Sequence, residues 1–325
     1  MAVFTHIDAE DVAALLAEYD IGTIVSLKGI AEGVQNSNFL LETETNASTH
    51  RFIVTIYESL ALQNDLPFFL GLMQHLAQKG INCPLPVQRR DGTLMSQLGG
   101  KPAAIVTFLK GMGLRNPTPR HCAELGKGLA SLHLAGADFQ GQRENDLGHR
   151  HWAALFAPNA ALADRIVPGM KTEIAQELDR IHTDWPSDLP SGLIHADLFP
   201  DNAFFLDHAL SGIIDFYFAC TDLWAYDLAI CLNAWCFEAD GAFNLTKAQG
   251  LLRAYHAHRP LLPDEVSALP ILCAGAAMRF LLTRLHDWGH RVDGALVTPK
   301  DPVPYLRRLR FHKAAQGASD YGVDL

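Results

Sequence analysis

The sequence predicts an α+β protein with a small, strand-rich N-terminal part and a larger, mainly helical C-terminal part. Before Gly111, short runs of β-branched and aromatic residues are separated by turn-forming residues. After Gly111, most segments repeat apolar residues every three to four positions, as amphipathic helices do. Strands that come first and helices that come later favour a sheet and a helical body that are separate. We therefore expect two lobes, residues 1–107 and 108–325, joined by a hinge near 108–111.

The N-terminal part begins with a helix and continues with strands. Asp8 can cap the helix with Asp11 three residues later, and an apolar stripe follows from Val12 to Tyr19. A second helix is predicted over 66–79, where Gly80 supplies a C-terminal stop. Five β-rich runs predict a small antiparallel sheet; they span 23–30, 37–43, 51–57, 93–97 and 102–109.

The C-terminal part is predicted to be helical except for one segment. The helices are expected over 119–134, 160–183, 223–238, 246–258 and 267–288. Between the second and the third, Leu193-Ile194 is typical of a strand that leads into a loop. Two apolar runs, 203–206 and 212–214, can then pair as a hairpin around a turn at 207–211.

Composition excludes several classes of protein. The 325 residues are 49% hydrophobic and carry a formal net charge of −10, which provides for a sizeable core and argues against a nucleic-acid partner. The six cysteines show no C-x-x-C spacing and have apolar neighbours, so we expect reduced core residues. The N-terminus lacks the pattern of a signal peptide, and Arg279 and Arg284 interrupt the longest apolar stretch. These features predict a cytoplasmic protein without a membrane segment, and they say nothing of its oligomeric state.

One constellation of polar residues points to phosphoryl transfer. His195-Ala-Asp197 is followed by Asn202, and Asp215-Phe216 comes after the second strand of the predicted hairpin. Phosphoryl transfer needs a carboxylate to orient and deprotonate the acceptor hydroxyl, and an amide and a second carboxylate to hold Mg²⁺. The hairpin would make Asn202 and Asp215 neighbours, which suits a cation that prefers oxygen ligands. We therefore predict Asp197 as the catalytic base and Asn202 with Asp215 as the Mg²⁺ ligands.

Three stretches of this chain resemble the aminoglycoside phosphotransferase and choline kinase superfamily, and most closely its bacterial homoserine kinases. They are residues 192–205, 212–222 and 226–236, and the likeness extends from Glu32 to Arg284. The resemblance implies a protein-kinase-like two-lobed fold, the use of ATP and Mg²⁺, and L-homoserine as the phosphate acceptor in threonine biosynthesis. It also implies that His195 and Asp227 support the catalytic loop. Other hydroxylated acceptors stay open, namely choline or ethanolamine, methylthioribose and an aminoglycoside.

The nucleotide is expected to bind to a loop between the first two strands and to the hinge. Glycines let backbone amides approach phosphates, and amide or hydroxyl side chains add donors. The predicted nucleotide-binding residues are Gly29, Gly33, Asn36, Ser37, Asn38, Phe108 and Leu109. Kinases of this superfamily carry a cation on the third strand and a partner Glu on the next helix, but here Thr55 occupies the strand position and the helix has no Glu. A catalytically inactive binding protein is therefore a third hypothesis.

The acceptor site is less well indicated by the residues. A zwitterionic amino acid needs an Arg for its carboxylate, and Arg279 and Arg284 lie on an otherwise apolar predicted helix. Tyr217 is a further substrate-binding candidate. Tyr217 and four other aromatic residues after Asp215 could form a cage for a quaternary ammonium, although core packing is the favoured interpretation; the others are Phe218, Trp224, Tyr226 and Trp235.

Overall fold

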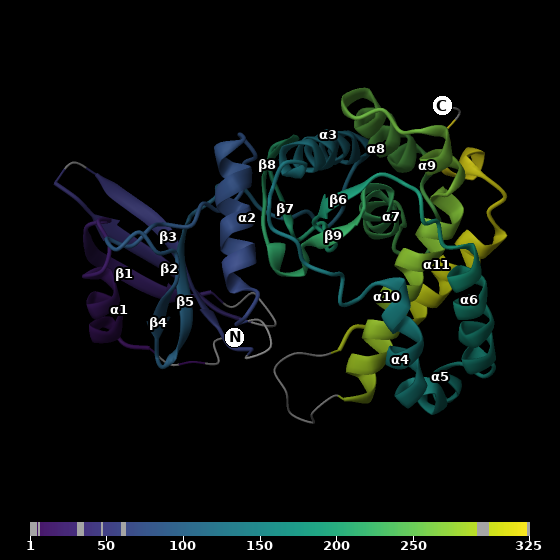
Figure 1. The fold of residues 1–325 in the computed structure, drawn as a ribbon, viewed down its shortest axis with the longest axis horizontal. Coiled ribbons are helices and arrows are strands. Elements are labelled where there is room, and N and C mark those ends of the chain that lie inside the picture. Colours follow the sequence, from purple (N-terminus) through teal and green to yellow (C-terminus); the bar gives the residue numbers. More distant parts are fainter. Residues whose placement is uncertain are drawn as a thin grey trace. The chain divides into compact units, whose positions relative to one another are not determined.

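The computed structural model describes residues 5, 7–30, 36–46, 48–59, 63–290 and 299–323. The chain divides into two compact units, Met1–Lys110 and Gly111–Leu325. The first is built around a sheet and the second is mainly helical (Figure 1). The predicted α+β class is confirmed.

The first unit contains a five-stranded antiparallel sheet with the strand order β1-β2-β3-β5-β4. The strands are β1 Thr23–Gly29, β2 Asn36–Glu44, β3 Thr49–Tyr57, β4 Ser96–Leu98 and β5 Lys101–Thr107. All five predicted strands are present, with ends that move by a few residues. The bounds of β4 differ most, because this edge strand pairs with β5 over only three residues.

Two helices complete the first unit. In α1 (Ala9–Leu16), Asp8 accepts hydrogen bonds from the N–H groups of Glu10 and Asp11, and the Asp11 carboxylate accepts from the N–H of Asp8, so the predicted cap is confirmed. The apolar stripe of α1 packs on Leu41, Val54 and Ile56 of the sheet. Helix α2 (Leu66–Gln78) ends before Gly80, whose φ of 88° is the left-handed conformation that glycine adopts without steric cost.

The second unit consists of helices around two small strand pairs (Figure 1). Its α-helices are α3 Pro119–Gly136, α4 Trp152–Phe156, α5 Ala160–Ile166, α6 Met170–Asp184, α7 Trp224–Trp235, α8 Leu245–His258, α9 Pro263–Ser267, α10 Leu269–Gly289 and α11 Val303–Ala314. The single helix predicted over 160–183 is wrong. It breaks into α5 and α6 because Pro168 and Gly169 interrupt it, and Gly169 has a φ of 84°. The sequence analysis did not predict α4, α9 or α11.

The segment that carries the predicted catalytic residues is built from four short strands. Strand β6 (Ser191–Ile194) pairs with β9 (Cys220–Leu223), which the sequence analysis had assigned in part to the following helix. Strand β7 (Ala203–Leu206) pairs with β8 (Ala209–Ile213), so the predicted hairpin is present. Its turn is shorter than predicted and consists of Asp207 and His208, where Asp207 adopts a φ of 55°.

Helices α3 and α8 lie side by side with their backbones in close contact (Figure 1). A Cβ atom on Gly126 of α3 would overlap the carbonyl oxygen of Leu251, and one on Gly250 of α8 would lie 2.9 Å from the carbonyl oxygen of Pro119. Two glycines therefore set the separation of these helices.

All six cysteines are free and buried, which confirms that they are core residues. Burial raises the pKa of the Cys83 thiol to about 12, so this side chain stays a neutral thiol at physiological pH. In the described part of the chain, no helix combines the length and the apolar character that a bilayer crossing requires.

Candidate active site

The loop after β6 carries Asp197 in a backbone conformation that is fixed on several sides. Ala196 has a φ of 63°, which is sterically unfavourable for a residue with a Cβ atom. Its N–H donates to Asp227 Oδ1 at 2.9 Å, and its carbonyl oxygen accepts from Arg279 Nη1. Contacts at both ends of this residue hold the unfavourable conformation in place.

Asp227 on α7 is the centre of the contacts beneath this loop. Its side chain is fully buried, and Oδ2 accepts from the N–H of His195 at 2.8 Å and from Nε2 of His133 at 3.1 Å. His133 in turn contacts the Tyr255 hydroxyl through Nδ1 at 2.7 Å. Burial alone would raise the pKa of Asp227, but the hydrogen bond and charge interaction with His133 hold this pKa below its usual value. The carboxylate therefore stays ionised and accepts hydrogen bonds from the loop.

His195 uses both ring nitrogens within the loop. Nδ1 lies 3.2 Å from the N–H of Asp197 and therefore accepts, which leaves Nε2 to donate to the carbonyl oxygen of Ile214 at 2.9 Å. Burial lowers the pKa of His195, which favours the neutral ring that this pattern requires. The arrangement supports the predicted structural role, because neither nitrogen is left to exchange a proton with a substrate.

The β7–β8 hairpin brings the two predicted metal ligands together. The N–H of Ile214 donates to the carbonyl oxygen of Asn202 at 2.9 Å, and Ala203 pairs with Ile213 at the same end. The Asn202 side chain donates through Nδ2 to the carbonyl oxygen of Asp197 at 2.8 Å and to Asp197 Oδ2 at 3.3 Å. One end of the hairpin therefore places Asn202 against Asp197 and next to the residue that precedes Asp215.

Burial perturbs both carboxylates of this group. It raises the pKa of Asp197 to about 7, with Asp215 and Asp201 raising it further and Arg279 and Lys300 opposing the rise. It also raises the pKa of Asp215 to about 6, and the negative charge of Asp201 adds to this rise. Two carboxylates in a partly buried site repel each other and favour a nearby cation.

The three predicted acceptor residues lie in different surroundings. Tyr217 belongs to the short 3₁₀ turn Phe216–Phe218, and its backbone N–H donates to the Asp215 carboxylate. Arg279 of α10 is almost completely buried, and its guanidinium carbon lies 4.6 Å from the Phe280 ring centre. Because Arg279 donates to the carbonyl oxygen of Ala196, it helps to hold the loop that carries Asp197. Arg284 is half-buried and donates from Nη1 to the carbonyl oxygen of Asp301 at 3.0 Å.

Tyr305 and Arg308 of α11 lie near this group and were not predicted from the sequence. The Arg308 guanidinium carbon lies 4.4 Å from the centre of the Tyr305 ring, and the same distance separates Arg284 from that ring. The sequence does contain a signal for this helix, because Tyr305, Leu306, Leu309 and His312 have helical spacing. The structure shows that all four are buried.

The predicted nucleotide-binding residues belong to the first unit and its C-terminal end. Gly29 ends β1, Asn36 to Asn38 begin β2, and Phe108 and Leu109 follow β5. Gly33 lies outside the described residues. The hydroxyl of Ser37 donates to Glu58 Oε1 at 2.5 Å. Thr55, at the position where the superfamily has a cation, is buried on β3 and donates from its hydroxyl to Asn38 Oδ1 at 2.8 Å.

The aromatic residues after Asp215 do not gather into one cage. Tyr226 and Trp235 are buried in the core, and Trp235 Nε1 donates to the carbonyl oxygen of Leu198 at 2.8 Å. Trp224 already has a cation against its ring, since the Arg259 guanidinium carbon lies 4.5 Å from the ring centre. The preferred interpretation of core packing is confirmed for Tyr226 and Trp235.

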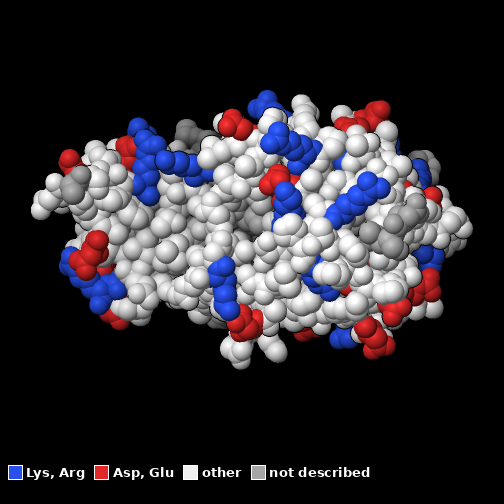
Figure 2. Space-filling view, turned by 90° about the horizontal axis from the view of Figure 1, so that it is seen from above, with Lys and Arg blue, Asp and Glu red and all other residues white. Residues whose placement is uncertain are grey.

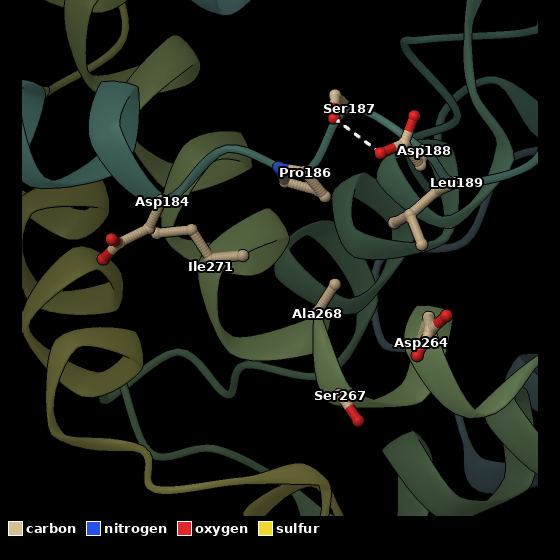
Figure 3. Close-up of a pocket in the computed structure, with 9 residues that line it drawn as sticks. All are labelled: Asp184, Pro186, Ser187, Asp188, Leu189, Asp264, Ser267, Ala268 and Ile271. Carbon is tan, nitrogen blue, oxygen red and sulfur yellow. Dashed lines mark hydrogen bonds between the residues drawn. The ribbon is translucent and has the colours of Figure 1, made fainter.

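A shallow pocket of about 430 Å³ contains none of the predicted site residues (Figure 3). The end of α6, the 186–189 segment, and helices α9 and α10 supply its walls. It is lined by Asp184, Pro186, Ser187, Asp188, Leu189, Asp264, Ser267, Ala268 and Ile271. The Asp184 carboxylate points away from the other labelled side chains (Figure 3), so the three acidic residues of the pocket do not converge on one point.

On the face shown in Figure 2, lysines and arginines are interspersed with acidic residues.

A helical unit that gathers a carboxylate, an amide and a second carboxylate at one hairpin has the groups that phosphoryl transfer requires. The model of the phosphotransferase enzyme family matches residues 26–261, a range that includes this hairpin and its loop. The chain belongs to the phosphotransferase enzyme family.

Its similarity to individual proteins extends over the whole chain. It is 58% identical to the homoserine kinase of Azorhizobium caulinodans and 56% identical to that of Xanthobacter autotrophicus, in each case over 99% of both chains. The solved structures that match with a TM-score of 0.65 include two that are named for different substrates. They are spectinomycin phosphotransferase in complex with ADP and spectinomycin (13% identical, 98% of both chains) and choline kinase from Cryptosporidium parvum (15% identical, 94% of both chains). These distant likenesses confirm the predicted protein-kinase-like fold.

Proposed function

We propose that this chain transfers the terminal phosphate of ATP to the side-chain hydroxyl of L-homoserine, as a homoserine kinase of threonine biosynthesis. The observation that carries the reaction class is the convergence of Asp197, Asn202 and Asp215 in the second unit. The acceptor is supported by the full-length identity with curated homoserine kinases. The intact set of three polar residues speaks against a catalytically inactive binding protein.

In this proposal, Asp197 orients the acceptor hydroxyl and accepts its proton. Asn202 Nδ2 contacts Oδ2 of the carboxylate, and in the described part of the chain Oδ1 has no hydrogen-bond partner. The hydroxyl can therefore donate to Oδ1 while Asn202 fixes the side chain. Burial raises the pKa of Asp197 to about 7 in the absence of a cation, and a raised pKa makes a carboxylate a better proton acceptor.

The residues present fit a Mg²⁺ ion. Because Asn202 Nδ2 donates to Asp197, the other atom of the amide, Oδ1, faces away and is available as a metal ligand. Asp215 supplies a second oxygen, and its raised pKa is what a buried carboxylate shows in the absence of a cation. When bound, Mg²⁺ would neutralise charge on the nucleotide phosphates.

The remaining predicted roles belong to the same proposal. Residues 1–107 would contribute nucleotide binding, with Gly29, Gly33, Asn36, Ser37 and Asn38 near the phosphates and Phe108 and Leu109 at the hinge. The enzyme would work in the cytoplasm, where reduced thiols such as the six described here are the rule.

Coupled ADP release with a panel of acceptors tests the proposal. We expect Mg²⁺-dependent release with L-homoserine and none above background with choline, methylthioribose or kanamycin. The Asp197→Asn variant serves as the control for release without transfer. Turnover of another panel member in the absence of turnover of L-homoserine would contradict the assignment of the acceptor, and no turnover at all would support an inactive protein.

A further inference from the structure

Two arginines from different helices share one aromatic platform in the second unit. Arg284 comes from α10 and Arg308 from α11, and each guanidinium carbon lies 4.4 Å from the centre of the Tyr305 ring. Tyr305 is fully buried, and within the described residues its hydroxyl has no hydrogen-bond partner. The platform therefore consists of two guanidinium groups that each lie against the ring of one buried phenol, whose hydroxyl has no partner among the described residues.

Among the described residues, neither cation forms a close ion pair with a carboxylate, although the charge of Asp301 acts on Arg284. Other arginines of the second unit do have such partners, since Arg310 pairs with Glu173 and Arg259 with Glu265. Arg284 donates only to a backbone carbonyl, that of Asp301. Burial lowers the pKa of Arg284, and the charge of Arg308 lowers it further, against the opposing influence of Tyr305 and Asp301. Like charges held together in a partly buried position are stabilised when an anion binds to both.

The platform adjoins the loop that carries Asp197. Arg279 donates to the carbonyl oxygen of Ala196 and lies against the Phe280 ring, whose centre is 5.3 Å from that of Tyr305. The negative charge of Asp197 also raises the pKa of Tyr305. Lys300 also acts on Asp197, and its Nζ lies 5.9 Å from the ring centre of Phe199. Arg279 and Lys300 thus act on the predicted base directly, and Arg284 and Arg308 lie against the ring of Tyr305.

We propose that Arg284 and Arg308 bind the α-carboxylate of the amino-acid acceptor, with Tyr305 as the platform that positions both guanidinium groups. This inference rests on the proposed function and names the residues that select its substrate. A guanidinium matches a carboxylate with two parallel N–H donors. The same cations repel choline and aminoglycosides, which are positively charged.

The test compares L-homoserine with L-2-amino-1,4-butanediol, in which a CH₂OH group replaces the carboxylate. For Arg308→Met, we expect KM for L-homoserine to rise roughly 10- to 100-fold with kcat nearly unchanged. The KM or inhibition constant of the diol should change less than about twofold. Arg284→Met should behave in the same way, and Arg308→Lys should recover part of the loss. Arg307→Met is the matched control, because Arg307 is exposed on the same helix.

The possible outcomes separate the two proposals. If the wild-type enzyme fails to phosphorylate L-homoserine, the proposed function itself is wrong. If the wild type is active but neither arginine variant raises KM for L-homoserine, or the diol is affected equally, the carboxylate assignment is overturned. Thermal unfolding verifies that each variant is folded. If Arg308→Met does not fold, Arg284→Met and Arg308→Lys decide the question by the same comparison.

Discussion

Asp197 is held at both its backbone N–H and its carbonyl oxygen, by His195 and Asn202. Its backbone position therefore does not depend on its own carboxylate. A change at this side chain can remove the chemical group and leave the loop in place, which makes Asp197 a suitable residue for separating chemistry from structure.

We expect Asp197→Asn to lower kcat by roughly 10²- to 10⁴-fold, because a neutral amide cannot accept the proton of the acceptor hydroxyl. Nucleotide affinity should stay close to that of the wild type. Steady-state kinetics and nucleotide titration by calorimetry measure the two effects, with Asp188→Asn in the shallow pocket as a control. Turnover near the wild-type value in a folded variant would remove Asp197 from the mechanism.

The two predicted metal ligands differ in charge, and this difference predicts a ranking. Asp215→Ala should weaken Mg²⁺-dependent ATP binding more than Asn202→Ala does, because it removes a charge together with an oxygen ligand. Magnesium titrations of ATP binding on both variants provide the comparison. Equal losses, or a larger loss for Asn202→Ala, would contradict the assignment of the ligands.

At the level of secondary-structure elements, the first turn of α7 holds the loop after β6. Asp227 accepts from two consecutive backbone N–H groups of the loop and from His133 of α3. Three elements therefore meet at one buried carboxylate.

Asp227→Asn should destabilise the protein by about 1–3 kcal/mol, because the new NH₂ group cannot accept the hydrogen bonds that buried donors offer. Activity should fall as well, since the loop loses its anchor. Urea unfolding and kinetics check both effects. Asp179→Asn, on the exposed side of α6, is the control and should change neither. A fully stable and active Asp227→Asn variant would show that the loop is held by other contacts.

The sequence predicted elements best where local signals were strong. The cap at Asp8 and the stop at Gly80 fixed α1 and α2 closely. In contrast, the periodicity across α5 and α6 concealed the break at Gly169. Strand β9 was not predicted, because its pairing with β6 depends on residues far away in the sequence. Helix α11 was missed because three arginines and a lysine interrupt its apolar pattern.

The same reason explains which parts of the candidate site could be predicted. Asp197, Asn202 and Asp215 lie within 19 residues, on one loop and at the end of the hairpin that follows it, so that spacing alone indicated their proximity. The contact of Arg279 with Ala196 joins residues 83 positions apart. Such contacts depend on how helices pack, and no local pattern encodes them. The roles of the predicted residues in catalysis and binding stay predictions until the variants are measured.

For the whole molecule, buried histidines link stability to pH. His312 is almost completely buried; Asn233 donates through Nδ2 to two carbonyl oxygens, so its Oδ1 must accept from His312 Nε2 at 3.1 Å. The ring is therefore neutral, with Nδ1 accepting from the Tyr321 hydroxyl at 2.9 Å. Burial lowers the pKa of His312 to about 3, and the charge of Arg308 contributes.

This lowered pKa predicts a loss of stability in acid. The unfolded chain binds the proton near pH 6.5 and the folded chain only near pH 3, so the contribution of His312 is complete above pH 6.5. It falls by about 1.4 kcal/mol for each pH unit below that value. The buried carboxylates of Asp197 and Asp215 have raised pKa values and act in the opposite direction, so the effect must be isolated by a variant.

His312→Gln should be less stable than the wild type at pH 7, because it loses fitted hydrogen bonds. The difference in the free energy of unfolding should narrow by roughly 2 kcal/mol between pH 7 and pH 5. Urea unfolding at the two pH values measures it, and the exposed His258→Gln variant should show no such narrowing. A constant difference would mean that folding does not lower the pKa of His312.

The close backbone contact of α3 and α8 limits which mutations this lineage can accept. Gly126 and Gly250 set the separation of two helices that also carry His133 and Tyr255. A methyl group at either glycine would force the helices apart and lengthen the hydrogen bond on which the orientation of His133, and through it Asp227, depends. We therefore expect substitutions at these two glycines to impair the protein, although neither residue touches a substrate. A single added methyl group between α3 and α8 is enough to disturb the support of the catalytic loop.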